Sequence, residues 1–334
     1  MRRIGLAVVL IFSLTLVPLV ANAEQTGRVP VLGVLSPYSA PPPERLHQNP
    51  VATKLRELGW IEGRNLIVER AFAEGHEDRL PDLAAMLAGR RVDVIWTLGP
   101  SSAVAAARAT KTIPIVFWGV GFPVELGLIS GLARPGGNVT GVAFSPGVEI
   151  IGKQLEFLKE ISAGVKRLAW IDDPESRRTV SGGLRQGNTV LEDAAHILRF
   201  ELRRYPVQKP DDLDAVFAAA VVWRAQALGA QVSPLLLRER KRIVEFANRH
   251  RLPTAFGIKD FVDVGGLLSY APDTPTTMAQ SAVYVDRILR GSQPADLPVQ
   301  QPTKFELVIN LKTAKALGLA IPQSVLVRAD EIIQ

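Results

Sequence analysis

The sequence predicts an α/β protein made of two consecutive α/β lobes of similar size, each built on a parallel sheet. Short apolar runs alternate with segments of helical periodicity along the chain. The runs are nearly all apolar rather than alternating, as expected of strands that helices cover on both faces. The pattern restarts near the middle of a chain of 334 residues, which is longer than one hydrophobic core usually serves.

In the first half, expected strands alternate with expected helices, which is the βαβ arrangement of a parallel sheet. The expected strands cover residues 31–35, 66–71, 92–97, 115–117 and 139–144. The expected helices cover residues 44–58, 80–89, 101–110 and 124–132.

The second half repeats this alternation and ends in a further strand and helix. The expected strands cover residues 167–171, 200–205, 227–232, 254–256, 267–270 and 305–310. The expected helices cover residues 149–160, 180–198, 211–223, 235–250, 275–290 and 312–317.

The first 23 residues have the pattern of a secretory signal peptide. Arg2 and Arg3 precede a charge-free apolar stretch that closes with Ala21-Asn22-Ala23, a small-x-small cleavage site. We therefore expect export and cleavage after Ala23; the alternative is an uncleaved membrane anchor. The chain has no cysteine, so neither a disulfide nor a thiol-linked lipid anchor is possible. An exported protein without a lipid anchor fits a periplasm best.

The charge pattern argues against nucleic-acid binding. The formal net charge of +6 is mild, and two of its positive charges lie in the signal. The basic run 238–242 carries an acid and continues at helical spacing into apolar residues. It is typical of the solvated face of an amphipathic helix, and no DNA-binding motif accompanies it.

Residues that directly follow strands are the candidates for ligand binding, because open parallel sheets bind ligands at the carboxyl ends of their strands. Ser36 follows the first strand, and Gly99, Ser101 and Ser102 follow the third. Gly99 permits close backbone approach, and Ser101 can cap a helix whose free N–H groups favour an anion. A ligand carboxylate or phosphate would suit this position; an ordinary cap with nothing bound is the alternative.

Aromatic residues near the same strand ends predict an apolar pocket wall. They are Tyr38, Trp118, Phe122 and Tyr270, with Gly119 in a glycine-rich loop beside Trp118. Aromatics at strand ends also serve simple packing, so both interpretations stay open. In the second lobe, Asp173 and Glu175 follow a strand, where they could bind a ligand ammonium or cap a helix.

Enzyme, metal and nucleotide chemistry find little support in the sequence. Gly99-x-Ser101-x-Ala103 resembles a degraded nucleophile elbow, but no histidine follows a late strand as a triad would need. The four histidines are too scattered for a metal site. The loop at 119–124 lacks the third glycine of a dinucleotide fingerprint. We therefore expect no enzyme activity and no cofactor.

Four segments carry a resemblance to a known family. They are residues 58–65 (LGWIEGRN), 133–141 (ARPGGNVTG), 284–291 (YVDRILRG) and 301–318 (QPTKFELVINLKTAKALG). The chain resembles the ABC-transporter substrate-binding proteins that include tryptophan- and tyrosine-binding members, over essentially all of its mature length. The resemblance implies a type I periplasmic-binding-protein fold, in which three crossover strands join two Rossmann-like lobes with parallel sheets and the lobes close on a ligand.

The family fold also implies where the chain crosses between the lobes, near 141–146, 270–273 and 298–303. We therefore expect a signal peptide at 1–23, lobe 1 at 28–143 plus 272–300, and lobe 2 at 144–271 plus 301–334.

The sequence departs from the family where ligand specificity is expected. The usual Gly-Asp-Pro-Val after the fourth strand is Gly121-Phe122-Pro123-Val124 here. An Asn-Pro-rich loop becomes residues 172–176 (DDPES), and Tyr-Gly-Pro-Ser becomes residues 270–273 (YAPD). The acid missing at Phe122 would have been a candidate ammonium partner, so an amino-acid ligand is placed in doubt.

The leading hypothesis is the periplasmic binding component of an ABC importer. Its ligand would be a small carboxylate with an aromatic or apolar body, and its partner an ABC permease in the inner membrane. We expect a monomer that binds no nucleic acid. A ligand-sensing subunit that docks on a membrane receptor is the alternative, and a secreted hydrolase using Ser101 is the third hypothesis.

Overall fold

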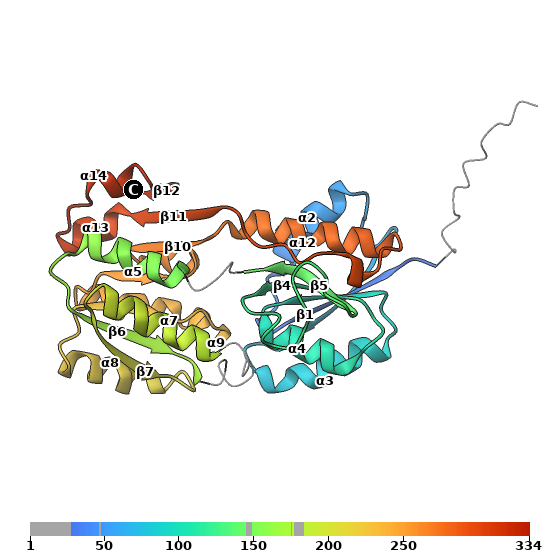
Figure 1. Cartoon of the computed structure of the whole chain (residues 1–334), viewed down its shortest axis with the longest axis horizontal. Helices are drawn as coiled ribbons and strands as arrows, with labels where there is room; N and C mark the ends of the chain where they lie inside the picture. The colour runs from blue at the N-terminus through green and yellow to red at the C-terminus, as the bar shows by residue number, and fades with distance from the viewer. Residues whose placement is uncertain (1–27, 47, 145–148, 175, 177–183) are drawn as a thin grey trace, which may run out of the picture.

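The structure is a computed structural model that describes residues 28–46, 48–144, 149–174, 176 and 184–334 (Figure 1). The expected signal peptide and Glu175 lie outside these residues. Two units, each a sheet with helices packed on it, lie side by side along the longest axis of the molecule. Within the described part of the chain, no helix is both long enough and apolar enough to cross a membrane.

The first sheet has five parallel strands in the order β2-β1-β3-β4-β5. We call this sheet and the helices packed on it lobe 1. Its strands are β1 (Val31–Ser36), β2 (Ile67–Phe72), β3 (Val94–Leu98), β4 (Ile115–Val120) and β5 (Val139–Ala143). Its helices are α1 (Pro43–Leu46), α2 (Pro50–Glu57), η1 (Glu77–Arg79), α3 (Leu80–Gly89), α4 (Pro100–Ala109), α12 (Thr274–Leu289) and η2 (Pro294–Asp296).

The second sheet has seven strands in the order β12-β11-β10-β9-β8-β6-β7, and with its helices it forms lobe 2. Its strands are β6 (Arg167–Asp172), β7 (Glu201–Pro206), β8 (Ala227–Ala230), β9 (Thr254–Phe256), β10 (Leu268–Pro272), β11 (Phe305–Asn310) and β12 (Glu331–Ile333). Its helices are α5 (Glu149–Ile161), α7 (Leu184–Ile197), α8 (Asp212–Val222), α9 (Pro234–Arg238), α10 (Arg240–Arg249), α11 (Asp260–Asp263), α13 (Leu311–Leu317) and α14 (Gln323–Leu326).

Helices cover both faces of each sheet, so each lobe has two hydrophobic cores. In lobe 1, α3 and α4 pack on one face, and α2 and α12 pack on the other. In lobe 2, α5, α7 and α13 pack on one face, and α8 and α10 pack on the other. Covered faces explain why the inner strands, such as β3, β4 and β8, are apolar, whereas the edge strands β2 and β7 carry charged residues.

The chain passes between the lobes three times. It leaves lobe 1 after β5, returns from β10 directly into α12, and leaves again after η2 to form β11 (Figure 1). The third passage runs beside the first, with Ala143 N donating to Gln300 O at 2.8 Å. It also runs beside the second, with Asp273 N donating to Lys304 O at 3.2 Å.

Several expected elements differ from the observed ones. No helix forms over 124–132, where turns surround Gly127 at a φ of 67°. The helix expected over 44–58 is divided, because Asn49 caps α2 and Pro50 begins it. The single helix expected over 235–250 is likewise two helices that meet at Glu239. Strand β11 pairs antiparallel with β10, so the second sheet is not wholly parallel.

Candidate ligand-binding site

A cavity of about 470 Å³ lies where the carboxyl ends of β1, β3 and β4 face lobe 2. Lobe 1 contributes Ser36, Tyr38, Phe72, Leu98 and Trp118 to its wall. Lobe 2 contributes Leu237, Ile258 and Asp260, and α12 contributes Thr274 and Met278. Its volume is in the range of small-molecule sites.

Ser36 and Tyr38 line this cavity directly after β1. Ser36 is 2% exposed, and its Oγ accepts a hydrogen bond from Tyr38 N at 3.1 Å. Since that oxygen acts only as an acceptor there, its hydroxyl hydrogen is available to a ligand. Burial raises the pKa of the Tyr38 phenol, and the charges of Glu77 and Asp260 raise it further. Tyr38 therefore stays a neutral donor, and its hydroxyl has no hydrogen-bond partner among the described residues.

Trp118 on β4 forms an aromatic wall of the cavity. Its Nε1 donates to Thr277 Oγ1 at 3.2 Å, and its ring meets Phe144 edge-on at 6.1 Å. These two contacts fix the orientation of the indole. A fixed aromatic face suits a flat or apolar ligand body.

The predicted anion site at the start of α4 is not part of this cavity. Gly99, at a φ of 80°, is the cap residue rather than Ser101, because Pro100 already occupies the first helical position. Ser102 Oγ donates to Leu98 O at 2.5 Å, so its one hydrogen is already engaged. Ser101 lines a separate groove between α3 and α4 together with Arg108.

The other predicted residues also lie away from the cavity wall. Gly119 packs against the backbone of Gly99, and Phe122 O accepts from Leu126 N in the following turn. Asp173 is 4% exposed, and its Oδ1 accepts from Ser176 N at 3.1 Å, which is a local capping role. Tyr270 pairs with Leu307 inside the second sheet and stacks on Phe305 at 5.8 Å.

Asp260 is a residue of the cavity wall that the sequence analysis did not name. It begins α11, lines the cavity from lobe 2, and is close enough to Tyr38 to raise the pKa of that phenol. Its carboxylate has no hydrogen-bond or ion-pair partner within the described ranges. A signal for it existed, because residues 257–260 directly follow the strand expected at 254–256. Those residues belong to the strand-end positions where ligands bind.

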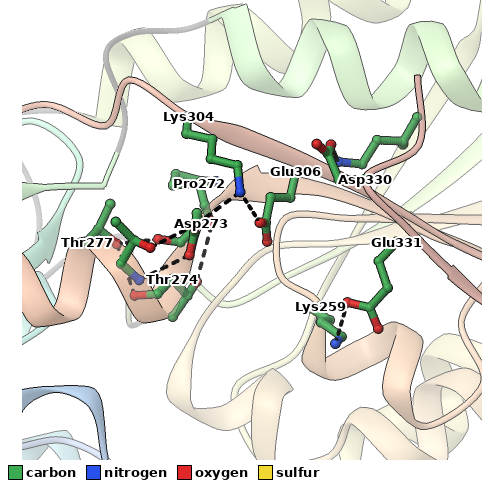
Figure 2. Close-up of polar contacts among 11 residues, drawn as sticks. Lys259, Pro272, Asp273, Thr274, Thr277, Lys304, Glu306, Asp330 and Glu331 are labelled. Atoms are coloured by element: carbon green, nitrogen blue, oxygen red, sulfur yellow. Dashed lines mark hydrogen bonds and ion pairs between the residues drawn. The ribbon is translucent and has the colours of Figure 1, made fainter. Parts of the chain in front are cut away.

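A polar cluster connects the second and third passages between the lobes (Figure 2). Lys304 Nζ lies 3.3 Å from Asp273 Oδ2 and 2.8 Å from Glu306 Oε1. Asp273 also caps α12, accepting from Thr276 N at 3.0 Å and from Thr276 Oγ1 at 2.8 Å. The side chain of Asp273 therefore holds the start of α12 and the third passage at one point.

Two lobes with a cavity between them, joined by three chain passages, define the class of two-lobed ligand-binding proteins with the type I periplasmic-binding-protein fold. Residues 43–333 match the model of the ABC transporter substrate binding protein family, and the chain belongs to that family.

Similar proteins agree with this assignment. A tyrosine-binding protein of Clostridioides difficile is 24% identical over 265 residues, which are 79% of this chain and 74% of that protein. A conserved domain protein of Vibrio cholerae superposes with a TM-score of 0.81 at 28% identity, covering 91% of this chain and all of that one. A domain from Streptococcus pneumonia, in complex with L-Trp, gives a TM-score of 0.79 at 22% identity over 92% of this chain and all of that one.

Proposed function

We propose that this protein is the periplasmic binding component of an ABC importer. Its ligand would be a small amino acid or related acid with an aromatic or apolar body. The observation that carries the proposal is the cavity between the lobes, which combines an aromatic wall with one carboxylate that lacks a partner among the described residues. Hinged closure of the lobes would bury the ligand and present a new surface to a membrane permease.

Asp260 and Tyr38, which both line the cavity, support an amine as one end of the ligand. Asp260 places a negative charge beside the neutral Tyr38 phenol. A ligand ammonium there would make a charge-assisted hydrogen bond. Asp260 would thus take the role expected of Asp173 or Glu175. It would also replace the acid that the family usually carries at the position of Phe122.

Ser36 and the aromatic wall support the rest of the ligand. The free hydrogen of Ser36 Oγ can be donated to a carboxylate oxygen. Trp118, Leu98 and Phe72 offer the apolar surface for its body. The relatives named for tyrosine binding and for an L-Trp complex fit a ligand of this kind.

Isothermal titration calorimetry tests the proposal, using protein refolded from denaturant to remove carried-over ligand. The panel is tryptophan, tyrosine, phenylalanine, leucine and the corresponding acids without the amino group. We expect an amino acid to bind, and Asp260→Asn to weaken that binding roughly ten- to a hundredfold, because a hydrogen bond to a charged group is lost. Asp263→Asn, on the same short helix but outside the cavity wall, is the matched control.

Preferred binding of the acids without the amino group would contradict the role given to Asp260. The proposed contact between Ser36 and a ligand carboxylate would still stand. Equal affinity of Asp260→Asn and Asp263→Asn would contradict the role of Asp260 as well. No binding across the panel would refute the proposed ligand class.

A further inference from the structure

We propose that the ligand extends beyond the cleft, with an elongated apolar tail that lies inside lobe 1 between its sheet and α2. This inference rests on the proposed function and adds the length and chemistry of the ligand. The cavity wall does not end at the carboxyl ends of the strands. It continues along the sheet to six residues that we call the inner arm: Leu32, Val34, Leu55, Trp60, Leu66 and Val68.

The position of these residues on the strands gives the inner arm its direction. On β1 the cavity is lined by Leu32, Val34 and Ser36, which alternate onto one face of the sheet. From Ser36 at the cleft to Leu32 at the start of the strand is roughly 13 Å at the usual rise per residue. A ligand that only filled the cleft would leave most of this length unused.

Exposure within the lobe marks where the hollow is open, at Val34 and Val68. Leu32, Leu55 and Leu66 are only 2–3% exposed and form its closed end. Strand β1 has a neighbouring strand on each side and helices on both faces, yet Val34 is only partly buried. Val68, which pairs with Leu32 on the neighbouring strand β2, is partly buried too. Protein interiors are normally packed as densely as organic crystals, with few voids larger than a water molecule. A hollow beside a central strand therefore indicates a space kept for a ligand.

The local sequence explains why α2 leaves this space. Asn49 and Pro50 start the helix late, so it has only eight residues. Of these, Val51 and Leu55 are the buried ones, and the small Ala52 also lines the cavity. At the β2 edge, Arg70 and Glu62 form a two-pronged ion pair at 2.6 and 2.7 Å. Both residues also line the cavity, and their side chains are 22% and 31% exposed, so the pair forms the solvent-facing edge of the wall at β2.

The chemistry of the wall indicates an apolar tail. The indole N–H groups nearby are directed into α12: Trp60 Nε1 donates to Asp286 Oδ1 and Trp96 Nε1 donates to Ser281 Oγ, each at 2.8 Å. Both tryptophans thus offer carbon surface to the cavity, and the other five inner-arm residues are aliphatic. The ligand class is an amine, or an amino acid, that carries a long hydrocarbon or aryl-alkyl chain.

A chain-length series measured by calorimetry tests this inference. The probes are norvaline, norleucine, 2-aminooctanoic acid and 2-aminodecanoic acid, with phenylalanine as a reference and octanoic acid as a tail without the amine. For the natural protein we expect affinity to rise roughly three- to fourfold with each added methylene through 2-aminooctanoic acid, as burial of hydrocarbon predicts. Octanoic acid should bind more weakly than 2-aminooctanoic acid.

Two variants on neighbouring residues of β2 locate the tail. Val68→Phe fills the inner arm, whereas Ile67→Phe places the same ring at a position that is 45% exposed and outside the cavity wall. We expect Val68→Phe to weaken 2-aminooctanoic acid at least about tenfold while norvaline is little changed, since a blocked arm loses the methylenes buried there. Ile67→Phe should behave like the natural protein. Thermal melting checks folding; if Val68→Phe unfolds, the series on the natural protein decides.

The inference is overturned if affinity peaks at norleucine or phenylalanine and falls with longer chains, or if the two variants respond alike. Phenylalanine binding would then persist, and the proposed function would stand. Absence of binding by every amino acid, phenylalanine included, would refute the proposed ligand class and this inference together.

Discussion

At the scale of single residues, Gly141 shows how closely two strands approach where β5 leaves lobe 1. Its φ is 153°, and a Cβ there would collide with the carbonyl oxygen of Phe117 and lie 2.7 Å from the Phe117 nitrogen. Both clashing atoms belong to the backbone of a central strand, so neither can move aside cheaply. Glycine at this position is a steric requirement of the sheet rather than a source of flexibility.

We predict that Gly141→Ala lowers the free energy of unfolding by about 3 kcal/mol or more, because overpacking against backbone relaxes poorly. Gly137→Ala is the matched control, since a Cβ there meets nothing within 4 Å. It should change stability by less than about 0.5 kcal/mol. Urea unfolding followed by circular dichroism measures both, and equal stability of the two variants would contradict the steric argument.

The candidate site divides into residues that the sequence could and could not identify. Ser36, Tyr38 and Trp118 line the candidate cavity, and their position after or at the end of a strand is visible in the sequence pattern. Ser101 and Tyr270 satisfied the same rule but face other elements, since strand-end position does not give side-chain direction. The inner arm could not be predicted, because the sequence pattern of its residues is that of ordinary core residues.

At the scale of elements, α12 is the helix that completes lobe 1 from a distant part of the chain. Three tryptophans reach it from β3, β4 and the turn after α2. Trp118, Trp96 and Trp60 donate their indole N–H groups to Thr277, Ser281 and Asp286 of this helix. The hydrogen bonds fix the rotation of α12 about its axis, which apolar contact alone would leave less specific.

Ser281→Ala tests this role. Ser281 is fully buried, and removing its Oγ leaves the indole N–H of Trp96 without an acceptor. We expect a loss of about 1–3 kcal/mol in the free energy of unfolding, the usual penalty for a buried polar group without a partner. Arg287→Ala, on an exposed position of the same helix, should have an effect below about 0.5 kcal/mol. A similar loss in both variants, measured by chemical denaturation, would argue against the indole contact.

Most elements were predictable because periodicity is a local signal. The bounds expected for β9, β11 and α3 agree with the structure, since apolar runs and helix starts are encoded within a few residues. The helix expected at 124–132 was wrong, because its apolar residues pack as a turn around Gly127. The antiparallel pairing of β11 was not expected, since strand direction follows from the path between lobes and not from local pattern.

At the scale of the whole molecule, the cluster around Asp273 links two of the three passages between the lobes (Figure 2). Burial alone would raise the pKa of Asp273, but hydrogen bonds from Thr276 and Lys304 outweigh it and hold the pKa below its usual value. A lowered pKa in the folded state means that the ionised carboxylate stabilises the fold. That stabilisation is present above the unfolded value of about 4 and is lost as the pH falls through the folded value.

Asp273→Asn should therefore be less stable than the natural protein by roughly 0.5–1 kcal/mol at neutral pH. Asparagine keeps the helix cap and loses the charge, and solvent screens the exposed Lys304. The difference in melting temperature between the two proteins should shrink as the pH is lowered below about 4. Asp296→Asn is the control on η2, outside this cluster. A difference that is constant from neutral to acidic pH would mean that the charge of Asp273 contributes nothing.

The route of the chain also dictates the order in which the lobes can be finished. The face of the first sheet that carries Trp96 and Trp118 has to wait for α12, which is synthesised only after strands β6 to β10 of lobe 2. Contacts of such long sequence separation form slowly. During synthesis lobe 1 therefore cannot form all of its native contacts until about residue 290 has been made. If the chain is exported as proposed, the late completion of lobe 1 would leave time for the translocation machinery to bind the chain before lobe 1 has folded.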